Sequence, residues 1–172
     1  MHPEALPYRA SPELQAARFC AIVAFPEMRV GVRTRDEAVV EITYLPPSIV
    51  ERAPANALAA RALRQLERYR SDPDAAFDLP LRIEGSDFQR RVWGALCEIP
   101  RGRTLRYGEM AKQLGSAARA VGQACGANRL PVVIPCHRVV AAGGLGGFAH
   151  HTDGYLLEAK RWLLAHEGAL AH

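Results

Sequence analysis

The segment SDPDAAFDLPL (71–81) divides this chain of 172 residues into two parts with different sequence patterns. It is rich in proline and aspartate and lacks periodicity, which is typical of a connecting segment. Short runs of Val, Ile and aromatic residues precede it, and helical patterns follow it. A chain of this length can form two small domains, so the sequence predicts an α/β (α+β) protein with domains at 1–80 and 81–172.

Strand patterns dominate the first half. The strand-like segments are 18–25, 28–34 and 38–45. Their β-branched and aromatic residues predict consecutive antiparallel strands. A helix is predicted after them, with Asn56 as its N-cap. The residues on its apolar face are Leu58, Ala62, Leu66 and Tyr69. We expect this helix to cover the sheet.

Helical signals dominate the second half. Ser86 and Gln89 have the spacing of a capping box, which predicts a helix from about Asp87. Its apolar stripe consists of Phe88, Val92, Leu96 and Ile99. A helix at 108–114, a break at Gly115 and a second helix from about Ala117 then form a helix-turn-helix pattern, as used against DNA. Two packed core helices fit this pattern equally well.

The last helix of this pair consists mostly of small residues. Arg119 and Gln123 are its main polar exceptions. Small side chains suit a close approach to a groove or to another helix, and they do not suit the reading of base edges in the major groove. Net charge is +4, with many arginines between 100 and 140. An anionic partner such as nucleic acid fits this charge, although charge alone favours an ordinary solvated surface.

No apolar run is long enough to span a bilayer, and the first residues lack the order of a secretory signal. We therefore expect a soluble, cytoplasmic protein with reduced thiols. The cysteines, which include no CxxC pair, are Cys20, Cys97, Cys125 and Cys136. Cys136 and His137 alone match a zinc site poorly, so no metal is expected. Cys20 and Cys97 are interpreted as core thiols.

Three segments together resemble one known family. They are AARAVGQACGAN (117–128), IPCHRVV (134–140) and AKRWLLAHEGA (159–169). They look like the signature of the O6-alkylguanine-DNA alkyltransferases, also called methylated-DNA–protein-cysteine methyltransferases. The resemblance is strong from about 88 to 168 and weak before that. It implies an N-terminal ribonuclease-H-like sheet-and-helix domain and a C-terminal helical domain with a winged-helix-like helix-turn-helix.

The resemblance implies direct DNA repair. The alkyl group, chiefly methyl, passes irreversibly from O6-alkylguanine, and secondarily from O4-alkylthymine, to Cys136. Thiolate is the best nucleophile that a side chain offers for displacement at carbon, and a Cys–His–acid relay can form it. The thioether product is stable, so each molecule acts once and no cofactor is required. By resemblance, His137 is the base, acting through a water, and Glu167 orients it.

Further roles follow from the same resemblance. Asn128 hydrogen-bonds across the turn that presents Cys136, and Tyr107 supplies a phenol near O6 of the leaving base. The partner is double-stranded DNA, entered from the minor groove by a monomer, with the target base flipped out and Arg119 inserted in its place. The residues expected to contact DNA are Tyr107, Arg119, Ala120, Gln123 and Cys125. The expected substrate pocket consists of Pro131, Val139, Phe148, Ala149 and His150.

The loop 146–155 departs from the family pattern, because it is longer and has Phe148 and Ala149 where relatives often have Tyr and Ser. His150 and His151 stand where relatives often have glycine. This crowding predicts that methyl adducts react much faster than benzyl adducts. Two other functions remain open. A non-catalytic lesion-binding protein is disfavoured by Cys136, and a thiol hydrolase would need an oxyanion hole, for which no feature argues.

Overall fold

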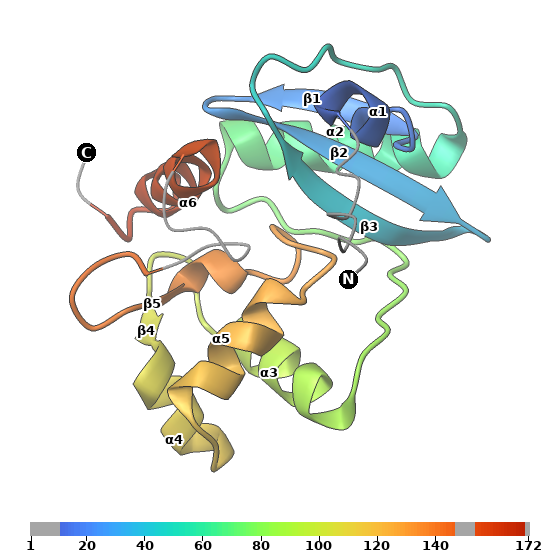
Figure 1. The fold of residues 1–172 in the computed structure, drawn as a ribbon. Coiled ribbons are helices and arrows are strands. Elements are labelled where there is room, and N and C mark those ends of the chain that lie inside the picture. Colours follow the sequence, from blue (N-terminus) through green and yellow to red (C-terminus); the bar gives the residue numbers. More distant parts are fainter. Residues whose placement is uncertain (1–10, 147–153, 171–172) are drawn as a thin grey trace, which may run out of the picture.

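The computed structural model describes residues 11–146 and 154–170. Figure 1 shows the sheet with α1 and α2 at the top of the view and α3, α4 and α5 at the bottom. The elements of the first half are α1 (Pro12–Ala16), β1 (Ala21–Phe25), β2 (Met28–Arg35), β3 (Ala38–Leu45) and α2 (Ala57–Ser71). The strands form an antiparallel sheet in the order β1-β2-β3, as predicted. Asp36 and Glu37 both have positive φ between paired residues 35 and 38, as a type I′ hairpin turn requires.

The helix α2 covers the sheet. It begins after Asn56, whose side chain accepts a hydrogen bond from the amide of Ala59. The buried residues of this helix are Ala59, Ala62, Leu66 and Tyr69. They join the core formed by the sheet, because their spacing places them on one helical face. The predicted N-cap and the predicted covering helix are confirmed, although Leu58 is only half-buried.

The second half contains short helices around the PCHR segment. Its elements are α3 (Asp87–Cys97), β4 (Leu105–Arg106), α4 (Tyr107–Leu114), α5 (Ala118–Gly126), a 3-10 turn η1 (Cys136–Arg138), β5 (Val139–Val140) and α6 (Gly154–His166). The capping box of Ser86 and Gln89 is formed. Gly115 ends α4 with φ 65°, a left-handed conformation that glycine adopts at little cost. The indole of Trp93 donates to the carbonyl of Ala124 (2.9 Å), which fixes α3 against α5.

The two halves pack together. One cluster of buried residues includes the sheet, α2, α3, α5 and α6. The amide of Ile42 in β3 donates to the carbonyl of Arg129, just after α5 (2.8 Å). The ring of Phe25 packs edge-on against Trp162 of α6. The predicted domain boundary falls between α2 and α3, in a segment that pairs with Val39 through a bridge at Leu81.

One expectation about the cysteines is wrong. Cys97 is exposed, because Leu96 and Ile99 occupy the buried side at the end of α3 and Cys97 points away from them. Cys20 is half-buried, and its sulfur accepts a hydrogen bond from the hydroxyl of Thr34. Within the described ranges, no helix is both long and apolar enough to cross a bilayer.

Candidate active site

Cys136 begins the turn η1 and is buried. Its amide donates to the carbonyl of Ile134 (2.8 Å), which forms a tight turn behind Pro135. Asn128 holds this segment from both sides. Its Nδ2 donates to the carbonyl of Ile134 (2.9 Å), and its Oδ1 accepts from the amide of Leu130 (2.9 Å). Asn128 therefore spans the turn that presents the cysteine, which is the contact that the resemblance implied.

The thiol of Cys136 is protonated in the free protein near neutral pH. Burial raises its pKa to about 11, although a hydrogen bond from Asn128 and the ammonium of Lys160 act in the opposite direction. Holding a thiolate at pH 7 against that pKa costs roughly 5 kcal/mol. A nearby base must therefore accept the proton when the thiol reacts.

His137 follows Cys136 directly and is the residue expected from the resemblance to be that base. It is fully buried, and burial lowers its pKa below 6.5 against the opposing effect of Glu167, so the ring is neutral. Its Nε2 lies 2.9 Å from Oε2 of Glu167. A carboxylate only accepts hydrogen bonds, so Nε2 carries the proton and Nδ1 is left as the acceptor. Nδ1 is buried and has no hydrogen-bond partner among the residues that the structure describes.

Glu167 directly follows α6 and is the hub of the buried polar network. Its Oε2 accepts from the hydroxyl of Tyr69 (2.6 Å), from His137 and from Nη2 of Arg138 (3.1 Å). Its Oε1 accepts from Nε of Arg138 (2.9 Å). Burial raises the pKa of this carboxyl, but the hydrogen bonds from His137 and Arg138 outweigh it and hold the pKa well below its usual range. The carboxylate is therefore ionised throughout the neutral range.

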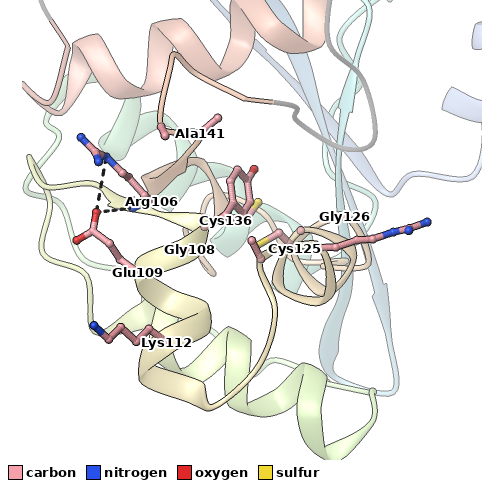
Figure 2. A pocket seen from close by; sticks show the side chains of 13 residues that line it. Arg106, Gly108, Glu109, Lys112, Cys125, Gly126, Cys136 and Ala141 are labelled. Carbon is pink, nitrogen blue, oxygen red and sulfur yellow. Dashed lines mark hydrogen bonds and ion pairs between the residues drawn. The ribbon is translucent and has the colours of Figure 1, made fainter.

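A cavity of about 830 Å³ opens onto Cys136 between α4 and α5. Figure 2 shows the sulfur atoms of Cys125 and Cys136 at its inner end, with Arg106 and Lys112 projecting away from them. Arg119, at the start of α5, also lines it and is exposed. The small residues of α5 leave this opening wide. Glu109 also lines the cavity and forms an ion pair with Arg106 (3.9 Å), and Lys112 and Arg119 leave the lining with a net positive charge that suits an anionic chain.

Tyr107 begins α4 and lines the same cavity as Cys136. Burial raises the pKa of its phenol, so the hydroxyl remains a proton donor. Its ring faces Lys160, whose Nζ lies 5.7 Å from the ring centroid. A Cβ on Gly146 would come within 3.0 Å of this ring, and Gly146 has φ +75°. Glycine at 146 therefore permits both the loop conformation and the position of Tyr107.

A second cavity, of about 260 Å³, also reaches Cys136. It lies between β3 and the residues after α5, and Pro131 and Tyr155 line it. Cys125 and Gly126 are shared by the two cavities, so the end of α5 forms a common wall. Within the described part of the chain, no three His, Cys, Asp or Glu side chains gather as a metal ion would require.

The structure brings some of the predicted site residues together and leaves others apart. Cys136, His137, Glu167, Asn128 and Tyr107 form one continuous site, and Pro131, Cys125 and Arg119 line its cavities. Ala120 and Gln123 lie on α5 outside both cavities, and Gln123 is exposed. Val139 is buried in β5 and lines neither cavity. Phe148, Ala149, His150 and His151 lie outside the described residues.

Three site residues were not predicted from the sequence. Tyr69 was expected only as a core residue of α2, and its partner Glu167 lies 98 residues later. Arg138 follows His137 directly, so its position in the PCHR segment was the available signal. Lys160 is fully buried in α6, and its Nζ donates to the carbonyls of Val139 and Leu145. A lysine within an otherwise apolar helical stripe was the signal for it.

Comparisons with known proteins agree with this geometry. The family description "6-O-methylguanine DNA methyltransferase, DNA binding domain" matches residues 87–169. A methylated-DNA–protein-cysteine methyltransferase of Methanosarcina acetivorans is 46% identical over 111 residues, which are 63% of this chain and 68% of the relative. The crystal structure of the O6-methylguanine methyltransferase of Mycobacterium tuberculosis superposes with a TM-score of 0.71 at 33% identity, covering 88% of this chain and 93% of that one. The chain belongs to the O6-methylguanine-DNA methyltransferase family.

Membership of this methyltransferase family confirms the resemblance seen in the sequence and the predicted class of function, DNA repair by alkyl transfer to a cysteine. A complex of the M. tuberculosis protein with DNA also superposes, with a TM-score of 0.70 at 33% identity. The mixed arrangement of a small antiparallel sheet and helices is that of these methyltransferases. The match covers only 33% of the longer "Regulatory protein ada" of Salmonella typhimurium, at 45% identity over 116 residues.

Proposed function

We propose that this chain transfers the alkyl group of O6-alkylguanine in double-stranded DNA, and secondarily of O4-alkylthymine, to Sγ of Cys136. The observation that carries the proposal is the position of Cys136. The thiol faces a cationic cavity, while the buried pair of His137 and Glu167 lies behind it. An ordinary core cysteine has neither an opening nor a base beside it.

The reaction balances with the groups of this chain. The thiol proton passes to Nδ1 of His137 through a bridging water, as the resemblance to the alkyltransferases implies. Glu167 stabilises the imidazolium that forms. The S–C bond forms as the bond from carbon to O6 breaks. The phenol of Tyr107 donates a proton or a strong hydrogen bond to the leaving base, so that guanine does not depart as a bare anion. Asn128 and Lys160 favour the transient thiolate.

We infer that α5 enters the minor groove and that the target base is flipped into the cavity at Cys136. Arg119 would take the place of the base in the stack, and unstacking costs roughly a few kcal/mol. Ala120, Gln123 and Cys125 of α5 would lie along the DNA, where the small side chains of Ala120 and Cys125 allow the helix to approach closely and Gln123 offers a polar group. A cytoplasmic monomer without a cofactor, with a ribonuclease-H-like first domain and a winged-helix-like second domain, completes the proposal.

Intact-protein mass spectrometry tests the proposal. The protein is incubated with a duplex containing one O6-methylguanine, and the same is done with Cys136→Ala. We expect a gain of one methylene mass that stops at one per molecule and is absent in the variant. Tight binding without a mass gain would favour a lesion-recognition protein instead. Multiple turnover of an ester or amide would favour the thiol hydrolase.

A further inference from the structure

We propose that Tyr69, supplied by the N-terminal half, is a positioning residue of the proton relay. Its hydroxyl would hold Glu167 so that His137 remains oriented and neutral until it accepts the thiol proton. The inference rests on the proposed function, because it concerns the same relay. It gives the first half of the chain a part in the chemistry besides packing.

The hydroxyl of Tyr69 and the imidazole of His137 share one carboxylate oxygen. The hydroxyl donates to Oε2 of Glu167 at 2.6 Å, and Nε2 of His137 donates to the same atom at 2.9 Å. All three side chains are buried. A hydrogen bond to an ionised group is stronger than a neutral one, and burial strengthens it further. Tyr69 and Arg138 therefore both help to fix the oxygen atom that orients His137.

Tyr69 is itself held in place from several directions. Its ring packs edge-on against the ring of His166, with centroids 5.2 Å apart, and at a tilt against the ring of Phe77, with centroids 5.6 Å apart. Its carbonyl oxygen lies 2.7 Å from Nε2 of His166, the residue that precedes Glu167. The last turn of α2 thus contacts the end of α6 through both backbone and side chain. This leaves the hydroxyl little freedom to turn away from the carboxylate.

The four donors to Glu167 are divided unequally between its two oxygens. Oε2 accepts from the hydroxyl of Tyr69, from Nε2 of His137 and from Nη2 of Arg138, and Oε1 accepts from Nε of Arg138. Each oxygen has about two lone-pair sites, so Tyr69 and His137 share the more heavily used oxygen. Without the hydroxyl, Arg138 alone would hold the carboxylate against rotation, and a rotated carboxylate would change the orientation of the imidazole.

The hydroxyl also sets the charge that His137 experiences. Burial and the negative charge of Glu167 raise the pKa of the Tyr69 phenol, so the phenol stays protonated and always donates. By donating, it draws negative charge from Oε2, which makes the carboxylate less able to stabilise imidazolium. Burial is the main cause of the low pKa of His137, and the donation from Tyr69 would act in the same direction. No proton leaves Tyr69 during the reaction; the thiol proton goes to Nδ1 of His137.

The test is the single-turnover rate of methyl transfer from a duplex with O6-methylguanine, measured from pH 5 to 9. For Tyr69→Phe we expect a rate about tenfold lower at the plateau, because a hydrogen bond to a charged group is lost. We also expect the acid limb of the profile to move to higher pH, because His137 becomes easier to protonate. If the ring of Tyr69 had only a structural role, the midpoint of the acid limb of the pH–rate profile would stay the same in the variant.

Thr34→Val is the matched control. The hydroxyl of Thr34 accepts a hydrogen bond from Nδ2 of Asn56 at 2.9 Å. Asn56 is the N-cap of α2, at the opposite end of this helix from Tyr69. This variant should lose stability without changing the plateau or the acid limb. In a double-mutant cycle, Tyr69→Phe should change the rate less than twofold when Glu167→Gln is already present. An equal loss in both backgrounds would overturn the proposal.

Two results distinguish the possible failures. If the wild-type protein gains no methylene mass, both the proposed function and this inference are wrong. If the wild-type protein gains this mass but Tyr69→Phe leaves the rate and the pH profile unchanged, only this inference is wrong. Proton NMR of the wild-type protein tests the inference even if the Tyr69→Phe variant does not fold. The phenolic proton of Tyr69 should be resolved and should shift as His137 titrates, and rapid exchange of that proton with water would contradict the proposal.

Discussion

The ammonium of Lys160 donates to the carbonyl oxygen of Val139 across 2.8 Å in the interior of the protein. It also donates to the carbonyl of Leu145 at 2.6 Å, so one buried cation ties both ends of the segment after η1. Burial lowers the pKa of Lys160 to about 8, and Cys136 opposes that shift. The lysine is therefore mostly charged at pH 7, where it can favour a thiolate.

Lys160→Met should lower the free energy of unfolding by about 2–4 kcal/mol, because two carbonyls lose a charged donor in the interior. Between pH 8 and 10.5, the unfolded chain keeps a lysine proton that the folded protein has released. The stability contributed by Lys160 thus rises with pH in that window. Urea unfolding should show a larger deficit for the variant at pH 9.5 than at pH 7.5; a shrinking deficit would count against this reading.

The cysteines should differ in their reaction with iodoacetamide. Burial raises the pKa of both thiols, but Cys97 is exposed, whereas Cys136 is buried and its pKa is raised to about 11. We expect peptide mapping at pH 7.5 to find Cys97 labelled at least about tenfold faster, since the thiolate is the reacting species. After incubation with DNA that contains O6-methylguanine, Cys136 alone should carry the methyl group, and Cys97 should still be labelled by iodoacetamide. Fast labelling of Cys136 in the free protein would contradict the buried, protonated thiol.

Acid should destabilise the protein through two groups of the relay. The pKa of His137 is lowered by burial, so below pH 6.5 the unfolded chain gains a proton that the folded protein does not. The depressed pKa of the Glu167 carboxyl adds stability that is present above about 4.5 and is lost as pH falls. Unfolding free energy should therefore decrease from pH 7 to 4, and His137→Gln should flatten the part just below pH 6.5. A protein that becomes more stable on acidification would refute this.

Gly146→Ala should slow methyl transfer by about tenfold or more. The added Cβ would come within 3.0 Å of the Tyr107 ring and 3.1 Å of the amide of Ala141, at a φ of +75°. The ring must shift, and a small displacement of a positioned donor can lower a rate strongly. The titration of His137, followed by NMR, should stay unchanged because the relay lies elsewhere. Gly143→Ala, where a Cβ meets no atom within 4 Å, serves as the control.

Local signals were sufficient to predict much of the fold. The N-cap at Asn56 and the capping box at Ser86 depend on residues within one turn, so the sequence displays them directly. Short runs of β-branched and aromatic residues likewise predicted the three strands. The expected core position of Cys97 was wrong, because cysteine is buried on average but the helical face here points outward. Composition could not indicate which face that would be.

The site could be predicted as far as its motifs extend. Cys136 and His137 are adjacent in the chain, and Asn128 and Glu167 lie in recognisable segments around them. The contact of Tyr69 with Glu167 joins residues 98 positions apart, so neither segment indicates the other. The hydroxyl of Tyr69 reaches Glu167 because the last turn of α2 packs against the end of α6. Contacts of this kind are determined by packing and are not written in any one stretch of sequence.

The distance in sequence between the parts of the relay has a consequence during translation. Glu167 is synthesised 30 residues after His137, and Tyr69 long before either. Until Glu167 has been made and the chain has folded, Cys136 has neither the oriented His137 nor the burial that raises its pKa, and it is an ordinary exposed thiol. The proposed relay therefore forms only when segments made early and late in synthesis have packed together, and folding also shields the thiol from reagents that attack exposed cysteines.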